Sequence, residues 1–419
     1  MKKTLNSLKI FCCLLLGLVL PAIGALQVQA QEAPLPEKEA PAARPALSDV
    51  QWKKTVVERK FRSEGVAVAD VNHDGKMDIL VGDVWYEAPH WTPHEIRTPH
   101  DYGDGSNGYS EAFLCFADDI NHDGWADLVV VGFPGKPCYW YQNPQNHPGH
   151  WQEHLIWHSA CDETPNYVDL FGNGQKVLLM ATQPEGQMAW FAPDTDLNKP
   201  WKMHPISKPS TKDERVPGTE QFSHGLGYGD INGDGRNDVL IRQGWWEQPA
   251  NARTSEQPWT FHPANLGYDC ANMYAADLDG DGLNDVISSS AHQKGIWWHR
   301  QMPGKGGAEF TRHLIENDFS ESHSMNFVDI NGDGKKDLVT GKRWWAHGPK
   351  GDIDPNAPAV LVWLEIKSKP GAAPEFVTHQ IDNDSGVGTQ FCVADINGDG
   401  RPDIIISNKK GVFVFEQLR

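Results

Sequence analysis

Four histidines occupy positions from which a central catalytic or metal-binding site could form. His224 and His323 each lie six residues before the first aspartate of an acidic loop, while His292 and His347 follow the second strand of their repeats. Imidazoles that meet at one point can bind Zn²⁺, Mn²⁺ or Mg²⁺, or can transfer protons as general acid and base. The alternative is that each histidine is a hydrogen-bonded residue of a central channel.

Carboxylates and cations fall in the same loops. Glu64 and Glu163 occupy the position of His224 in their own repeats, and Glu111 lies two residues earlier in another. Eight cations are predicted on the same face: Arg62, Lys136, Arg242, Lys294, Lys342, Arg343, Lys409 and Lys410. Such a ring could attract an anionic ligand or stabilise a developing enolate, or it could be ordinary solubilising charge. The predicted catalytic residues are His224, His292, His323, His347, Glu111, Lys342 and Arg343.

An acidic nine-residue pattern, with acidic or amide side chains at positions 1, 3, 5 and 9 and glycine at position 6, occurs six times. Its members are Asp70, Asn72, Asp74, Asp78; Asp119, Asn121, Asp123, Asp127; Asp230, Asn232, Asp234, Asp238; Asp277, Asp279, Asp281, Asp285; Asp329, Asn331, Asp333, Asp337; and Asp395, Asn397, Asp399, Asp403. A seventh copy, from Asp169, has lost its other acids. Oxygen ligands at this spacing suit Ca²⁺, so the sequence predicts about six structural calcium sites. Solvated acidic turns without metal are the alternative.

The residues after each loop exclude an EF-hand. Position 12 is Thr340 or Val81 instead of a bidentate glutamate, and DLVT or DILVG favours a strand over a helix. Aromatic pairs such as Trp245-Trp246, and Trp/Phe-x-x-His elements such as Trp259/His262, recur in phase with the loops. These repeats predict an all-β, seven-bladed β-propeller with four-stranded blades and calcium loops in six of them. The strand near residues 52–57 is expected to complete the last blade.

The D-x-[DN]-x-D-G-x-x-D pattern between strands resembles the FG-GAP/VCBS repeat of integrin α propellers. HGLGYGDINGDG from His224, SSAHQKGIWW around His292 and the segment from Ser322 to Gly348 are similar to the propeller of fungal aldos-2-ulose dehydratase/isomerase and its bacterial relatives. That resemblance implies metal-dependent elimination of water from a keto-sugar. The cupin domains that accompany the fungal propeller are missing here, which leaves the isomerase reaction without support.

The N-terminal region has the pattern of an exported protein. Residues 1–30 combine lysines, an apolar core and a small-residue site, as in a signal peptide, and residues 31–49 are a Pro/Ala/Glu-rich linker expected to be disordered. The propeller is assigned to residues 50–419, in the periplasm or outside the cell. No other apolar run is long enough to span a bilayer, and a net charge of −19 argues against nucleic acid as a partner.

Two functions remain open from the sequence. The first is a carbohydrate lyase or dehydratase, in which a channel metal would assist β-elimination on a keto-sugar or uronide. The second is a non-catalytic module that binds a glycan or a protein on the same face, because a propeller serves both purposes. The sequence does not determine the substrate, the metal, the oligomeric state or whether any of Cys115, Cys138, Cys161, Cys270 and Cys392 form a disulfide.

Overall fold

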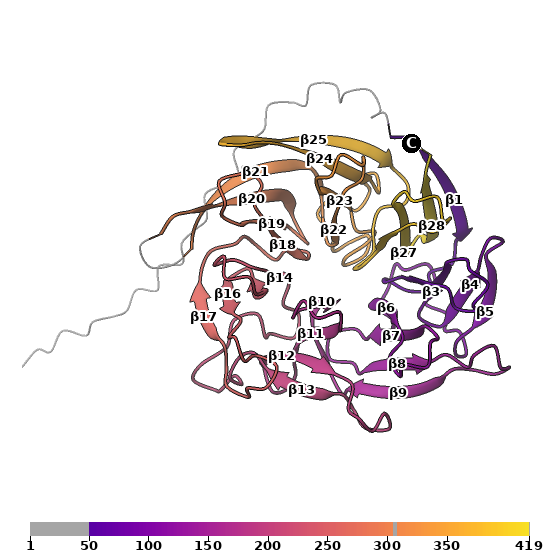
Figure 1. Cartoon of the computed structure of the whole chain (residues 1–419). Coiled ribbons are helices and arrows are strands. Elements are labelled where there is room, and N and C mark those ends of the chain that lie inside the picture. Colours follow the sequence, from indigo (N-terminus) through magenta and orange to yellow (C-terminus); the bar gives the residue numbers. More distant parts are fainter. Residues whose placement is uncertain (1–49, 305–307, 419) are drawn as a thin grey trace, which may run out of the picture. The chain divides into compact units, whose positions relative to one another are not determined.

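The computed structural model of the protein describes residues 50–304 and 308–418. Within these ranges, all of its secondary-structure elements are β-strands. The predicted signal peptide (1–30) and linker (31–49) lie outside these ranges. Within them, no helix is long and apolar enough to cross a membrane. The all-β class is therefore confirmed, and the sheets follow one another around a centre as in a β-propeller (Figure 1).

Three antiparallel sheets of four strands each come first along the chain, and in each the strands pair in sequence order. The first contains β2 (Ala67–Ala69), β3 (Asp78–Val81), β4 (Val84–Glu87) and β5 (Thr92–Glu95). The second contains β6 (Leu114–Asp118), β7 (Asp127–Val131), β8 (Cys138–Gln142) and β9 (Gln152–Trp157). The third contains β10 (Ala160–Val168), β11 (Val177–Thr182), β12 (Gln187–Ala192) and β13 (Lys202–Pro205). Figure 1 shows β6 and β10 near the centre and β9 and β13 at the periphery.

The next eight strands form one continuous sheet. They are β14 (Leu226–Gly229), β15 (Asp238–Ile241), β16 (Gly244–Glu247), β17 (Thr260–Pro263), β18 (Met273–Ala276), β19 (Asp285–Ser289), β20 (Lys294–Met302) and β21 (Glu309–Ser320). The innermost strands β14 and β18 pair in parallel, with Gly227 opposite Met273. A Cβ on Gly227 would lie 2.2 Å from the Met273 carbonyl oxygen, so the absence of a side chain permits this close approach.

The last two sheets again have four strands. One contains β22 (Met325–Val328), β23 (Asp337–Gly341), β24 (Leu361–Lys369) and β25 (Ala372–Asp382). The other contains β26 (Cys392–Ala394), β27 (Asp403–Asn408), β28 (Gly411–Gln417) and the N-terminal β1 (Trp52–Glu58). Because β1 pairs antiparallel with β28, the predicted completion of the last sheet by the N-terminal strand is confirmed.

The number of separate blades differs from the prediction. The described strands form five separate four-stranded blades, not seven, because the remaining eight strands are joined into one sheet at β14 and β18. The repeats in the sequence indicate the number of four-strand units. They do not show whether two neighbouring inner strands also form hydrogen bonds with each other. That depends on the small residues of β14, where Gly229 also lies too close to Ala275 to carry a side chain.

The repeated aromatic residues hold the outer strands in place. In each of six strand groups a tryptophan of the third strand stacks on the histidine of the fourth, with ring centroids 3.8–4.8 Å apart. The pairs are Trp85–His94, Trp140–His154, Trp190–His204, Trp245–His262, Trp298–His313 and Trp363–His379. Trp344 and Trp345, which also form an aromatic pair in the sequence, lie in the loop after β23, so Trp363 takes the stacking position in that sheet.

Candidate functional site

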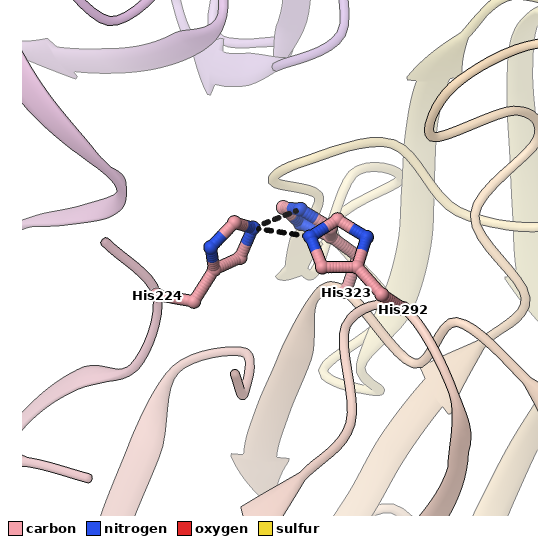
Figure 2. A group of neighbouring side chains, drawn as sticks. All are labelled: His224, His292 and His323. Atoms are coloured by element: carbon pink, nitrogen blue, oxygen red, sulfur yellow. Dashed lines mark hydrogen bonds between the residues drawn. The ribbon is translucent and has the colours of Figure 1, made fainter. Parts of the chain in front are cut away.

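Three histidines from three successive strand groups meet at one point (Figure 2). His224 precedes inner strand β14, His323 precedes inner strand β22, and His292 lies in the loop between β19 and β20. The Nε2 atom of His224 lies 3.0 Å from Nε2 of His292 and 3.2 Å from Nε2 of His323. His224 and His323 are buried, and the convergence follows from their equivalent positions before inner strands.

The proton position of His224 suits a cation at the cluster. The carbonyl oxygen of Phe222 can only accept, so His224 donates its Nδ1 proton to it at 2.9 Å and turns the lone pair of Nε2 toward the other rings. Burial, followed by the charge of Arg343, lowers the pKa of His323 well below its usual range, and burial lowers that of His292 to about 3. Neutral imidazoles are the form that binds metals. Ligands 2.0–2.1 Å from one tetrahedral ion stand about 3.3 Å apart, so the observed separations fit such an ion.

A buried carboxylate completes the cluster. Glu163 Oε2 lies 3.1 Å from Nε2 of His323 and 3.4 Å from Nε2 of His224. Glu163 belongs to a bulged part of β10, where the pairing with β11 is interrupted between Cys161 and Asn166. Its neighbour Asp162 has a φ of 59°, a conformation that non-glycine residues rarely adopt. The bulge therefore places the Glu163 carboxylate beside the histidine cluster.

A chain of alternating charges continues from Glu163 across the centre. Arg343 donates to Glu163 and to Glu64, each at 3.3 Å, and the Lys409 amine lies 3.7 Å from Glu64. Arg343 and Glu64 are buried, and only 6% of Lys409 is exposed. Burial lowers the pKa of Lys409 to about 8 despite the opposing charge of Glu64. A lysine of this kind is partly neutral near neutral pH and can accept a proton.

The other predicted catalytic residues lie in different surroundings. The His347 ring is 4.6 Å from that of His292, but its side chain is about half exposed. Lys342 is buried, donates to Ser320 at 2.9 Å and pairs with Glu321, so it is not a free cation for substrate. Glu111 is 57% exposed and pairs with Arg97 at 3.1 Å. Three of the seven predicted catalytic residues therefore form the cluster. Arg343 and His347 lie next to it, whereas Lys342 and Glu111 contact other partners.

The six acidic loops share one hydrogen-bond pattern. In the first loop, the carboxylate of Asp70 accepts from the backbone N–H groups of Asp74 and Gly75, and Asn72 Oδ1 accepts from Asp74. The position-9 aspartate is buried, and its two oxygens accept from two backbone N–H groups; in Asp78 these belong to Val71 and Ala88. The same pair of bonds recurs at Asp127, Asp238, Asp285, Asp337 and Asp403. Position 9 thus joins the loop to the third strand, a role that the spacing alone did not reveal.

Family models match the part of the chain that contains three of these loops and, separately, the last one. Residues 230–288 and 277–340 match the FG-GAP-like repeat, and residues 387–412 match the FG-GAP repeat. The chain carries FG-GAP repeats. No curated protein matches the sequence.

The propeller containing these FG-GAP repeats is similar to several solved structures, at low identity. The exotype rhamnogalacturonan lyase YesX is 13% identical with a TM-score of 0.41, and the match covers 88% of this chain and 74% of that chain. The biofilm matrix protein Bap1 of V. cholerae is 12% identical with a TM-score of 0.35, and the match covers 88% of this chain and 84% of that chain. At these values neither protein's activity is carried over to this chain.

Two residues of the candidate site, Glu163 and Lys409, were not among the seven predicted catalytic residues. Glu163 was recognised only as the positional equivalent of His224, although its place six residues before Asp169 was the available signal. Lys409 was one of eight predicted surface cations, yet it is buried beside Glu64. No short motif marks a lysine as buried, so only the three-dimensional contacts distinguish it from its neighbour Lys410.

Proposed function

We propose that the protein is a metal-assisted carbon–oxygen lyase that acts on a keto-sugar or uronide at the cluster of His224, His292 and His323. The observation that carries this proposal is the convergence of three Nε2 atoms with the Glu163 carboxylate. These four side chains would hold a divalent transition metal such as Zn²⁺. When bound, it supplies a Lewis acid that polarises a carbonyl or carboxylate oxygen.

The chain's own residues would carry the proton transfers. β-Elimination breaks a C–H bond next to the carbonyl and the C–O bond one carbon further, and the proton and the leaving group must both be received. Lys409 is the candidate base because its pKa is lowered to about 8 and the neutral amine can take the proton. The ammonium formed on Lys409 can then donate that proton to the leaving oxygen, because burial lowers the pKa of the half-exposed His347 and makes this ring a poor acid. Arg343 would hold Glu163 and Glu64 in position from between them.

The calcium sites are a second part of the proposal. We propose that the six acidic loops bind Ca²⁺ and stabilise the strand turns that carry them. In the fourth of the six loops, ligand atoms of Asp277, Asp279 and Asp285 lie within 4.8 Å of one another. In the first loop, the position-5 carboxylate of Asp74 instead pairs with Lys76 of the same loop, at 2.7 Å. We also propose that the protein is exported, since these loops suit the calcium-rich exterior of a cell.

A non-catalytic glycan- or protein-binding role is the alternative function. It is favoured by Phe222, which is 51% exposed directly beside the histidine cluster, as an exposed aromatic residue at a binding surface would be. Under this alternative the propeller would bind its partner on that face without turnover.

One experiment separates the two functions. Metal content of the purified protein is measured after dialysis, and uronide polymers and keto-sugars are then tested for the ultraviolet absorbance of an unsaturated product. A bound transition metal together with product formation supports the lyase. Calcium alone, with ligand binding but no product from any substrate, supports the binding function.

A further inference from the structure

A second cavity opens beside the histidine cluster and is not used by the proposed reaction. Its volume is about 370 Å³, at the lower end of the range of small-molecule pockets. It is lined by residues of the sheet β6–β9 and of the segment before it, among them Tyr109, Phe133, Lys136 and Tyr139. The size suits one sugar ring better than a longer chain.

Two residues that line the cavity, Tyr109 and Phe133, contact residues that bind members of the cluster. On one side Tyr109 lies under the guanidinium of Arg343, 5.8 Å from its ring centroid, and Arg343 binds Glu163. On the other side the ring of Phe133 lies 5.7 Å from that of Phe222, whose carbonyl oxygen accepts the His224 proton. One residue on each side, Arg343 and Phe222, therefore separates the cavity from the cluster.

The aromatic lining offers ring faces to a ligand. Tyr109 stacks on Phe133 with centroids 4.7 Å apart, and both rings, like that of Tyr139, are only partly buried. Tyr141 lies deeper and donates its hydroxyl proton to Glu153 at 2.9 Å. Flat apolar faces of this kind pack against the C–H groups of a pyranose ring.

The polar lining is balanced in charge. Two cations, Arg97 and Lys136, face two carboxylates, Glu111 and Glu153. Arg97 pairs with Glu111 at 3.1 Å, which leaves the lining both donors and acceptors but no net charge. A neutral polyhydroxylated ring, whose hydroxyls both donate and accept, matches this lining better than an acidic sugar does.

We infer that this cavity is a binding subsite for a neutral pyranose unit next to the unit that reacts at the histidine cluster. The inference rests on the proposed function for the reacting unit, and it makes the substrate an oligosaccharide or glycoside with at least two units. Binding of the neutral unit alone does not need the metal.

The test is saturation-transfer NMR on the full chain with methyl β-D-glucopyranoside, methyl α-L-rhamnopyranoside and D-galacturonate. At least one neutral glycoside should bind with an affinity in the millimolar range, as expected for a single small ring. Tyr139→Ala should weaken this binding about tenfold or more, while Tyr139→Phe, which keeps the ring, should retain it. Tyr268→Ala, which removes a tyrosine packed on Trp297 outside the cavity lining, serves as the matched control.

The outcomes distinguish this inference from the proposed function. Binding that persists in His224→Ala but is lost in Tyr139→Ala supports the subsite whatever the cluster does. Binding of neither neutral glycoside, or of galacturonate alone, overturns the inference even if the wild-type protein holds a metal. Loss of binding in Tyr268→Ala as well as in Tyr139→Ala would show that the effect is not local and would also overturn it.

Discussion

Nε2 of His224 lies 3.0 Å from Nε2 of His292, although 68 residues separate them in the chain. His224 donates its Nδ1 proton to a backbone carbonyl, so its Nε2 atom carries a lone pair. The short contact between the two Nε2 atoms is therefore favourable only when a proton or a cation lies between them. The relationship makes the cluster a stronger candidate for metal binding than its individual histidines, because the fold brings the ligand atoms together before any ion binds.

Removing one imidazole should remove one metal ion. We expect His224→Ala to lose a transition metal that the dialysed wild-type protein retains, and to lose about a hundredfold or more of any lyase activity. Elemental analysis and turnover of the same samples provide the measurement.

His262→Ala is the matched control, because His262 stacks on Trp245 and pairs with Glu247 at the outer strand. It should keep the metal. Equal metal content in wild type and His224→Ala would exclude the cluster as the metal site.

Lys409 should give the reaction a characteristic pH dependence. A base must be unprotonated, so kcat/KM should rise with pH and level off above about 8, the lowered pKa of this amine. Lys409→Met should remove the rise and most of the activity, whereas Lys410→Met should leave both unchanged. An unaltered pH profile in Lys409→Met would assign the proton transfer to another residue.

Calcium should stabilise the protein more near pH 7 than near pH 5. Burial raises the pKa of Asp337 and of four other position-9 aspartates to about 6, and that of Asp127 to about 7, above the usual value near 4. A raised folded-state pKa means that the protonated form favours the fold, so this contribution is present at low pH and is lost as the pH rises through about 6. Calcium favours the charged carboxylates and should offset that loss.

The measurement is the melting temperature of metal-free protein with and without added CaCl₂ at both pH values. Asp333→Asn removes one charge while keeping the side-chain oxygen that accepts from the Lys335 backbone N–H, and it should reduce the calcium effect near pH 7. A calcium effect that is the same at both pH values, or absent, would contradict the proposal for these loops.

The join between β14 and β18 should depend on Gly227. In Gly227→Ala the new Cβ would meet the Met273 carbonyl oxygen at 2.2 Å, so we expect a loss of about 1–3 kcal/mol in the free energy of unfolding. Urea unfolding provides the measurement.

The fold could largely be predicted because its units repeat. Alternating strands, acidic turns and the Trp/His stacks recur at regular intervals, and such repetition predicts a propeller even when each copy is weak. The pairing of β1 with β28 could be predicted because the strand near residues 52–57 lies before the first acidic loop. The joining of two units into one eight-stranded sheet could not be predicted, since it depends on a single backbone approach at Gly227.

The site could be predicted only as far as position along the inner strands determines it. His224, His323 and Glu163 all stand six residues before the first aspartate of a loop, and they meet. Lys342 was predicted to face a ligand, yet it pairs with Glu321 in the interior. The partner of a long flexible side chain is decided by which carboxylate the fold brings within reach, and the sequence spacing does not contain that information.

The pairing of β1 with β28 also sets the order in which the protein can be completed. Lys53 and its ion-pair partner Glu416 are 363 residues apart, so the first strand lacks its partner until β28 has been synthesised. Contacts so distant in sequence form late and slowly. Until β28 has been synthesised and has paired with β1, the exposed edge of β1 can pair with another chain. Loss of β28 would leave the newly made protein with this edge uncovered, and thus prone to aggregate before it can act.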